Sequence, residues 1–489
     1  MFFKLRQSKI LNNRGGALLF VVVFGAISFA FVVTALSGFA MYQNRLAISR
    51  HNREMAMQIA EAGVAYYRWH IYHNETDFQD GTATSGPYIH DYYDKNNNAI
   101  GKFSLGLIAP RLGSTVSTIS STGWMNVQEG SKRTVKVRVG KPSLTDYSYL
   151  TNSEIWIGST EVVHGRMHSN SSVQFDGLTD ATVSSWLEHF YCPPAQPNCQ
   201  GSADKGGVWG EGGPEVFFKY PASYRDFDLI NNKLDEIRTR AINIGVYLDD
   251  SPNRGWRIVF STTTQGGQEV NQAQVYIVNT CEGDMCTTGH HSSDPCSNYK
   301  CRDCYNTSQK KPSATQCCLD INSQTPYLTT TTPTIGYFYS EKTVWVEGVV
   351  KGSVVVGSNI DIVINNNITY PVKSEDNIIG LVARENVLIP YKIRTDLEVN
   401  ASMIAQFGAV QRYEYYNGQS PYKVLNSIKV NGSVVSYLIW TFSWVDNDNV
   451  VINGFTNTET TFNIYSLFNP PPSSPVGADY ALIDWQEIK

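Results

Sequence analysis

An uncharged segment near the N-terminus limits, more than any other feature, what this chain can fold into. Residues 17–41 read ALLFVVVFGAISFAFVVTALSGFAM and carry no charged side chain, whereas residues 1–16 carry four basic residues and no acidic one. At about 1.5 Å per residue, a helix of this length crosses the apolar layer of a bilayer. Because basic flanks stay on the cytoplasmic side, the rest of the chain is expected outside the cytoplasm.

Two kinds of segment combine a basic start with an apolar run. A secretory signal peptide, cleaved near residues 38–40, is one interpretation, but its apolar core is only 7–15 residues long. No turn or helix breaker separates residues 17–41 from an amphipathic stretch that reaches about Tyr72. We therefore expect one helix over residues 17–72, running from the membrane into solvent, with a plain signal anchor and stalk as the alternative.

The second half of this helix has apolar or small residues on one side. They recur at three- and four-residue spacing, with Asn52 as a polar interruption. The stripe consists of Ile48, Met55, Ile59, Ala62, Tyr66 and Trp69. Arg45, Arg50, Arg53 and Arg68 lie off it, as a solvated face requires.

These residues carry a family resemblance. The basic leader, Gly15-Gly16, the apolar helix from Ala17 and the motif AEAGVAYYRWH resemble type IV prepilins, especially PilX-type minor pilins and related pseudopilins. The resemblance implies cleavage between Gly16 and Ala17 by the membrane-embedded prepilin peptidase. It also implies contacts with other pilins along the helix. We assign those contacts to Val21, Ile48, Met55, Ile59, Ala62 and Trp69.

Two positions depart from the pattern of major pilins. Major pilins have Phe first and Glu fifth in the mature chain, where this sequence has Ala17 and Val21. The Glu carboxylate pairs with a neighbouring subunit's N-terminal ammonium inside the apolar filament core. Losing that pair should weaken docking beneath other subunits. The departure favours a minor or tip subunit.

Residues 73–143 predict a small antiparallel sheet of the pilin type. Phe103, Leu105 and Leu107 alternate with polar residues, and RTVKVRV places alternate valines on one face. DKNNNAIG, residues 94–101, predicts a hairpin turn. Asp94, Asn96 and Asn98 would suit a calcium loop, but the other ligands of an EF-hand are missing from the sequence.

Residues 144–280 predict a β-rich region with one amphipathic helix at 226–244. The helix has RDFD at its start, Gly245 as its stop, and an apolar face of Phe227, Ile230, Leu234, Ile237, Ala241 and Ile244. His164 and His168 suggest zinc, but an HxxxH pair needs a helix and these two lie in strand-and-turn sequence. We predict no metal site.

Residues 321–489 predict a parallel β-helix section followed by further β structure. VWVEG, SVVVGSN, IDIVINN and IIGLVA are short apolar runs broken every 8–11 residues by Gly, Asn or Asp, which suits the corners of a β-solenoid. A sandwich is the rival. Asn365, Asn366 and Asn367 suit either a corner or a stacked polar ladder. The predicted fold class is α+β, with a long stalk helix, a small sheet and a mainly β domain.

Three further segments resemble a pilus-associated family of proteins that have a PilX-type N-terminus and a large domain of unassigned activity. They are IGSTEVVHGRMHSN, DNIIGLVARENVLIP and NPPPSSPVGADYALIDWQEI. Each motif is short and unspecific by itself. The resemblance implies an architecture more than a function.

All nine cysteines fall in the part that is expected outside the cytoplasm, where disulfides persist. Residues 281–320 have few aliphatic side chains and would need covalent staples to fold. The candidates are Cys192, Cys199, Cys281, Cys286, Cys296, Cys301, Cys304, Cys317 and Cys318. Zinc is the rival, because Cys301 and Cys304 form CxxC near His290 and His291, but a second such knuckle is missing from the sequence.

Composition and motifs limit the function. A net charge of −5 leaves no basic footprint for nucleic acid. The sequence contains no GxSxG, HExxH, Walker or Rossmann pattern, and Asp361, Asp376 and Asp396 fit no clear rung spacing for a carbohydrate-active β-helix. We expect no enzyme and no cofactor.

The expected protein is a minor or tip pilin-like subunit of a type IV pilus or pseudopilus. It is expected to be a single-pass inner-membrane protein with a cytoplasmic N-terminus before assembly, and then to lie on the cell surface or filament. It displays a large β domain for assembly priming or adhesion to a glycan or protein that the sequence does not specify. A membrane-tethered surface protein and a β-helix carbohydrate enzyme are the alternatives.

Overall fold

The computed structural model describes most of the chain and divides it into two compact units. The described residues are 14–111, 114–192, 204–251, 255–280, 301–306, 311–312, 318–320, 325–332, 335–415, 421–446, 450–477 and 479–488. The first unit comprises Met1–Ile108, Thr118–Val137 and Trp485–Lys489. The second comprises Ala109–Ser117 and Arg138–Asp484.

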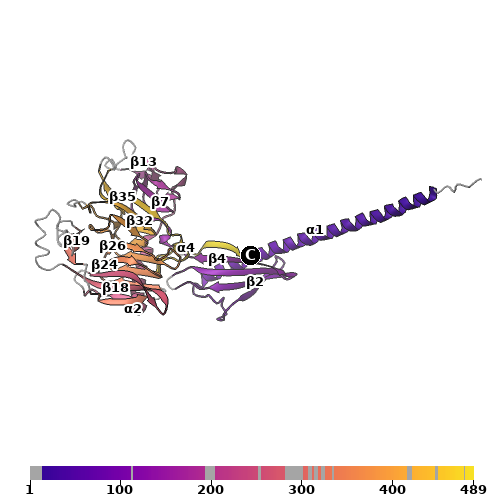
Figure 1. Ribbon diagram of the computed structural model, residues 1–489, viewed down its shortest axis with the longest axis horizontal. Helices are drawn as coiled ribbons and strands as arrows, with labels where there is room; N and C mark the ends of the chain where they lie inside the picture. Colours follow the sequence, from indigo (N-terminus) through magenta and orange to yellow (C-terminus); the bar gives the residue numbers. More distant parts are fainter. Residues whose placement is uncertain are drawn as a thin grey trace, which may run out of the picture. The chain divides into compact units, whose positions relative to one another are not determined.

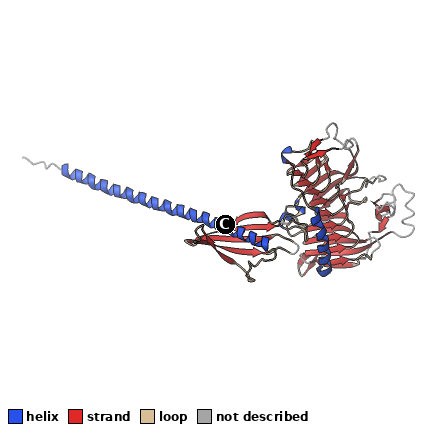
Figure 2. Ribbon diagram, turned by 180° about the vertical axis from the view of Figure 1, so that it is seen from behind, coloured by secondary structure: helices blue, strands red, loops and turns tan. Residues whose placement is uncertain are grey.

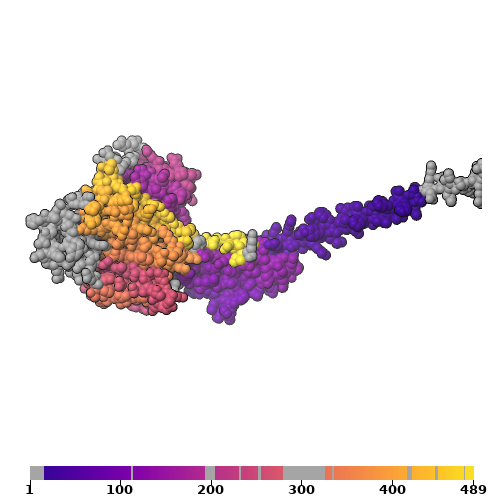
Figure 3. Space-filling model, in the orientation of Figure 1, coloured from indigo at the N-terminus to yellow at the C-terminus, as the bar shows by residue number. Residues whose placement is uncertain are grey.

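The first unit is built on one long helix, α1 (Arg14–His73), as the sequence predicts. All residues from 16 to 45 are exposed, including the large apolar side chains of the uncharged segment. Figure 3 shows this half of α1 in indigo as a bare rod of side chains. By length and composition it is able to cross a membrane, and an apolar surface of this size is unfavourable in water.

The second half of α1 buries a different face from the predicted stripe. Ile48 and Trp69 are more than half exposed, and of the stripe only Ile59 is fully buried. The buried face consists of Asn52, Ala56, Ile59, Ala60, Gly63, Val64, Tyr67 and Ile71. Three of these eight residues, Ala56, Ala60 and Gly63, are small, and Ala56 and Ala60 lie where the helix backbone approaches Gly123 of the sheet. Small side chains contribute little to a hydrophobic pattern. Asn52, predicted as an interruption, donates to Gln128 Oε1 at 2.7 Å.

A five-stranded antiparallel sheet packs against this face of α1. Its strands, in spatial order, are β1 (Tyr88–Tyr93), β2 (Ala99–Ile108), β3 (Ser117–Met125), β4 (Gln128–Gly140) and β36 (Ala481–Ile488). The predicted alternation is confirmed, because Val135, Val137 and Val139 are all fully buried. The fifth strand comes from the C-terminal end of the chain, which the sequence pattern did not indicate. Arg133 on β4 pairs with Glu487 on β36.

Truncating the chain after Gly477 is expected to destabilise this sheet by about 2–4 kcal/mol, the sum of several cross-strand pairs of the size measured in other sheets. Hydrogen exchange of the β4 amides in the full chain and in the truncated chain, both in detergent, would measure the effect. Exchange in β4 should accelerate at least about tenfold. Glu487→Ala, which removes only the ion pair, should leave it nearly unchanged. Equal β4 exchange in the truncated and full chains would show that β36 does not support the sheet.

The second unit is a stack of short parallel strands in two main sheets. In spatial order, the ten-stranded sheet contains β15 (Phe218–Lys219), β11 (Val183–Ser185), β8 (Met167–Ser169), β5 (Tyr149–Thr151), β33 (Ser433–Ser436), β30 (Ser402–Ala405), β27 (Ile378–Ala383), β25 (Ser353–Ser358), β23 (Ile335–Ser340) and β16 (Val246–Leu248). All neighbours in it pair in parallel.

The opposite, sixteen-stranded sheet begins with parallel strands and ends in antiparallel ones. Its main path contains β10 (Leu178–Thr179), β7 (Glu161–His164), β35 (Val451–Thr461), β32 (Val424–Asn431), β29 (Asp396–Val399), β26 (Ile362–Thr369), β24 (Thr343–Val349), β17 (Gly255–Gln265), β18 (Gln268–Thr280), β21 (Cys318–Asp320), β19 (Cys301–Asn306) and β20 (Lys311–Pro312). Beside this path lie β22 (Leu328–Thr332), β28 (Val387–Leu388), β31 (Val410–Gln411) and β34 (Ser443–Val445).

Smaller elements complete the second unit. A three-stranded sheet contains β14 (Val208–Trp209), β9 (Val173–Phe175) and β6 (Ile155–Ile157), and β12 (His189–Tyr191) pairs with β13 (Asp204–Gly206). The short helices are η1 (Leu144–Asp146), η2 (Glu215–Phe217), η3 (Phe227–Ile230), α2 (Asn231–Ile244) and α4 (Tyr465–Phe468).

Successive strands alternate between the two main sheets, so that each pair forms one coil of a parallel β-helix. The chain passes from β23 to β24, β25, β26 and β27 in this way, and Figure 1 shows β24, β26, β32 and β35 stacked in order. Val354 and Val356 point into the core between the sheets, whereas Val355 belongs to a second apolar layer outside. Burial on both faces explains the continuous apolar runs of these strands.

The order of the coils differs from the order of the sequence. β33 and β35, near the end of the chain, pair in parallel with β5 and β7, which precede the other coils in sequence. Pairing therefore crosses the boundary suggested between residues 144–280 and 321–489. After β15 the chain crosses the stack through η3 and α2 and enters β16, which lies at the opposite end of the ten-stranded sheet.

The predicted amphipathic helix makes this crossing. Figure 2 shows α2 running along the stack of strands, and it packs on β16, β23 and β25. The predicted apolar face is buried except for Ile244, which is 63% exposed at the end of the helix. Gly245 caps the helix by donating its N–H to the Ala241 carbonyl. The outer face of the ten-stranded sheet is thus covered where its side chains are apolar.

Candidate functional site

One column of side chains on the outer face of the ten-stranded sheet changes from apolar to polar along the stack. Strand register aligns one residue from each coil in this column, at about 4.8 Å per coil. From β16 onward it reads Tyr247, Tyr339, Gly357, Val382, Ile404, Val435, Leu150, His168, Ser184 and Lys219. The side chains from Tyr339 to Leu150, Gly357 aside, belong to the layer beneath η3 and α2. The last three are polar.

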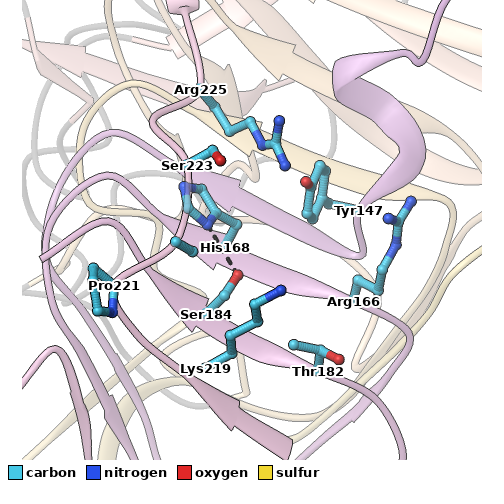
Figure 4. Close-up of a pocket in the computed structure, with 10 residues that line it drawn as sticks. Tyr147, Arg166, His168, Thr182, Ser184, Lys219, Pro221, Ser223 and Arg225 are labelled. Carbon is cyan, nitrogen blue, oxygen red and sulfur yellow. Dashed lines mark hydrogen bonds between the residues drawn. The ribbon is translucent and has the colours of Figure 1, made fainter. Parts of the chain in front are cut away.

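A pocket of about 360 Å³ lies over these three polar side chains. Figure 4 shows His168 and Ser184 at its base, with Lys219 and Arg225 reaching in from different segments. The backbone of residues 221–225, which follows β15, forms one wall. Two contacts hold this wall: Ala222 N–H donates to the Ser185 carbonyl at 2.7 Å, and Arg225 N–H donates to Asn170 Oδ1 at 2.9 Å.

Three cations surround the pocket. Arg166, in the turn before β8, and Arg225 both place their guanidinium groups against the Tyr147 ring, at 5.0 and 5.7 Å from its centroid. Such a contact favours a cation over an aromatic face. Arg225 Nε is buried without a hydrogen-bond partner among the described residues. Lys219 is exposed.

Asp146 supplies a carboxylate that interacts with the positive charge of Arg166. Arg166 donates to the Asp146 backbone carbonyl at 3.2 Å, whereas Asp146 Oδ2 accepts the Ser143 N–H. Burial raises the pKa of Asp146 to about 6, and the positive charge of Arg166 acts in the opposite direction. Asp146 does not line the pocket, whose lining residues include no carboxylate.

His168 is a neutral hydrogen-bonding group at the base of the pocket. Burial lowers its pKa to about 4, with a contribution from Arg225, against the opposing hydrogen bond to Asn170. Asn170 uses its amide hydrogens on Asn152 Oδ1 and the Arg225 carbonyl, so its Oδ1 accepts from His168 Nε2 at 3.2 Å. His168 Nδ1 is therefore an acceptor, 2.9 Å from Ser184 Oγ. The Ser184 hydroxyl also lies 3.0 Å from the Met167 carbonyl, and donates to one of the two.

Comparison with known proteins gives little. No protein-family model matches the chain, and no curated protein matches it. Among solved structures, it is similar to the competence-associated pilin ComZ from Thermus thermophilus, with 12% identity over 89% of this chain and 97% of that one. The TM-score is 0.29.

The predicted processing and assembly residues all lie on α1. Gly16 and Ala17 are helical, two and three residues after its start, and Val21 is exposed with the rest of the apolar half. Met55 and Ala62 are half-buried at the edge of the face that contacts the sheet. Ile48 and Trp69 point away from this sheet and stay available to another molecule.

The cysteine candidates are only partly described. Cys192 is buried and disulfide-bonded. Cys199, Cys281, Cys286, Cys296 and Cys317 lie outside the described residues. The register of β19 and β21 places Cys304 opposite Cys318, and Cys301 opposite Asp320. The sequence predicted no particular pairing among the seven cysteines from Cys281 to Cys318, and the disulfides of this segment stay a prediction.

The other residues that the sequence suggested are dispersed. His164 bonds Asp180 at 2.8 Å and lies on β7, in the opposite sheet from His168. Among the described residues, no three His, Cys, Asp or Glu side chains are grouped as metal ligands. Asp94 Oδ1 accepts the backbone N–H groups of Asn96 and Asn98 and so stabilises its own turn.

The three carboxylates that were considered for carbohydrate chemistry do not converge. Asp361 binds the amides of Asn386, Asp376 pairs with Arg111, and Asp396 binds Asn426 and Ser427. Asp446 closes the turn between β34 and β35 by accepting the Val450 N–H. Asn365 lies within β26 and donates to Glu347 Oε1 at 2.8 Å, in a polar contact between neighbouring strands rather than at a corner.

The pocket was not anticipated from the sequence. Of its lining residues, only His168 was considered there, as a candidate zinc ligand. Its cations come from a turn, a two-residue strand and a loop, and Arg166 and Arg225 are 59 positions apart in the chain (225 − 166). Only the fold brings these three segments together at one end of the ten-stranded sheet. No local pattern in the sequence marks the pocket, because its lining residues come from separate segments.

Proposed function

We propose that the chain is a pilin-like subunit of a type IV pilus or related pseudopilus, inserted in the inner membrane before assembly. The observation that carries the proposal is the division of α1. Its first half is apolar and exposed on every side, and its second half packs one face on a small antiparallel sheet. A helix of this kind can be held by lipid first and by the helices of neighbouring subunits later.

We further propose a minor or tip position for this subunit, with the second unit as the displayed domain for assembly priming or adhesion. Ala17 and Val21 stand where major pilins have Phe and Glu. Without the Glu carboxylate, a subunit cannot pair with the N-terminal ammonium of a neighbour in the apolar filament core. Labelling of the second unit on intact filaments should mark rare or terminal sites, and a uniform coat would contradict this position.

The processing step gives the direct test. The mature protein is expected to begin at Ala17, and N-terminal sequencing of the chain purified from membranes would determine the start. Gly16→Glu, which places a charged side chain at the cleavage site, should leave Met1 in place, whereas the matched change Gly38→Glu should not affect the start at Ala17. A native chain that keeps Met1 would indicate a signal anchor, and one that begins near Met41 would indicate a secretory signal peptide.

A further inference from the structure

We propose that the pocket beside His168 binds an acidic sugar, that is, a pyranose carrying a carboxylate or sulfate group. This site goes beyond the proposed pilin function and does not depend on it, because the whole pocket lies within the second unit. The proposal rests on the charge of the pocket, on its size and hydroxyl groups, and on an exposed aromatic pair next in sequence to its lining residues.

The charge of the pocket selects an anion. Three cations, Arg166, Lys219 and Arg225, line one hollow whose lining residues include no carboxylate. This is a local excess in a chain whose net charge is −5. Guanidinium groups bind planar oxyanions through paired N–H groups, and the buried Nε of Arg225 has no partner among the described residues. Because this Nε is sealed from solvent, an oxyanion in the pocket would be held by the guanidinium nitrogens that reach the hollow.

The interactions around the base fix the geometry of the site before a ligand arrives. Asn170 Nδ2 donates to the Arg225 carbonyl at 2.7 Å, and its Oδ1 accepts the Arg225 N–H, so one amide holds both backbone groups of Arg225. His168 is held by Asn170 and Ser184. A site built in advance binds more tightly because less freedom is lost on binding.

The size and the neutral groups of the pocket favour a sugar. About 360 Å³ suits a ligand of one or two pyranose rings. Thr182 and Ser223 offer hydroxyl groups that can donate to, or accept from, sugar hydroxyls, and Ser184, whose proton is used within the protein, can accept. A nucleic-acid backbone would instead need a basic stripe along the surface, whereas these cations surround a single hollow.

An exposed aromatic pair comes from the two segments that supply lining residues, although neither of its members lines the pocket. Trp186 follows Ser184 by two positions, and Tyr224 lies between the lining residues Ser223 and Arg225. Their rings meet edge to face with centroids 5.5 Å apart, and the two residues are 47% and 52% exposed. Exposed aromatic faces beside a polar pocket stack on the apolar C–H face of a pyranose ring, so the pair can hold the sugar while the cations hold its acidic group.

Titration calorimetry of the full chain in a non-ionic detergent tests the proposal. Trigalacturonate supplies the carboxylate form and a heparin-derived disaccharide the sulfate form, with maltotriose as the neutral sugar and inorganic sulfate as the bare anion. We expect at least one acidic saccharide to bind and maltotriose not to bind. The arm with the lower Kd identifies which acidic group the pocket prefers.

Matched variants locate the binding. Lys219→Gln and Arg225→Gln should each weaken acidic-saccharide binding about tenfold, as expected for losing one charged hydrogen-bonding partner. Lys373→Gln, which removes the same charge from an exposed turn elsewhere in the second unit, should change it less than about twofold. Trp186→Ala should weaken the saccharide and leave inorganic sulfate unchanged. Circular dichroism checks that each variant is folded.

Three results would overturn the proposal. They are no binding of either acidic saccharide at millimolar concentration, equal binding of maltotriose, and tighter binding of a short DNA duplex that Lys219→Gln abolishes. Equal losses in the Lys219 and Lys373 variants would also overturn it, by assigning the effect to overall charge. None of these outcomes changes the N-terminal residue of the mature chain, so failure of this proposal is separate from failure of the pilin proposal.

Discussion

Gly123→Ala is expected to detach the packed half of α1 from its sheet. Gly123 lies on β3 directly beneath the helix, and a Cβ at this position would overlap with the Ala56 carbonyl oxygen and the Ala60 nitrogen. Both are backbone atoms, so no side-chain rotation relieves the overlap. The helix would have to move away from Val135, Val137 and the other buried side chains of the sheet. We expect a destabilisation of about 2–4 kcal/mol, in the range of severe overpacking.

Gly130 provides a matched control in the same sheet. It lies on β4, and a Cβ added there meets no atom within 4 Å. Gly130→Ala should be neutral or stabilise the chain by up to about 1 kcal/mol, since alanine reduces the freedom of the unfolded chain. The free energy of unfolding of both variants, with limited proteolysis of residues 46–73, would measure the contrast. Equal stability of the two variants would contradict the close packing of α1 on β3.

Glu161→Gln is expected to make the second unit less sensitive to alkaline pH. Glu161 begins β7, which pairs with β35 where the end of the chain stacks on its earlier coils. Its Oε2 is sealed from solvent without a hydrogen-bond partner among the described residues. Burial raises the pKa of Glu161 to about 8, and a hydrogen bond from the Gly158 backbone acts in the opposite direction.

The direction of the pH effect follows from this raised pKa. Between its ordinary pKa of 4.5 and about 8, Glu161 holds a proton in the folded chain that it has released in the unfolded chain. Unfolding therefore releases a proton in this window, and stability falls as pH rises from 4.5 to about 8. Glutamine cannot ionise in either state. The variant should match the native chain near pH 4.5 and exceed it by about 2–4 kcal/mol near pH 8.

Thermal unfolding across this pH range is the measurement. At pH 8 the Glu161→Gln chain should melt roughly 3–8 °C higher than the native chain, and near pH 4.5 the two should agree. Glu188→Gln removes an exposed carboxylate between β11 and β12 and should produce no such divergence. A constant difference at all pH values would mean that the amide changes packing rather than ionisation.

Local patterns predicted the elements of this protein well. The stalk helix was expected over residues 17–72 and extends over Arg14–His73. The helix of residues 226–244 and the strands from Val344 to Ala405 also lie where their periodicity indicated. These features depend on neighbours within a few positions, which is the range over which a hydrophobic pattern carries information.

The face of α1 shows where local pattern fails. Tyr66, Trp69 and Ile48 make a stronger apolar stripe than Ala56, Ala60 and Gly63, yet the helix buries the latter group. The helix approaches Gly123 closely at Ala56 and Ala60, while Ile59, Val64, Tyr67 and Ile71 fill the rest of the buried face. The sheet that packs on α1 decided which helix face is buried. Its strand β3 lies about sixty positions further along the chain than the helix residues it contacts.

The sequence by itself determined a membrane-length helix, a sheet of alternating strands and the corners of a parallel β-helix, because each is set by residues close together in the chain. Only the tertiary structure decided that β36 joins the first sheet, that the last coils stack on β5 and β7, and that His168, Ser184 and Lys219 share one column. Pairing between distant strands depends on complementary edges and register, and a two-residue strand such as β15 has no periodicity to reveal its partner. The candidate binding site is built from such pairings, so it becomes visible only in the folded chain.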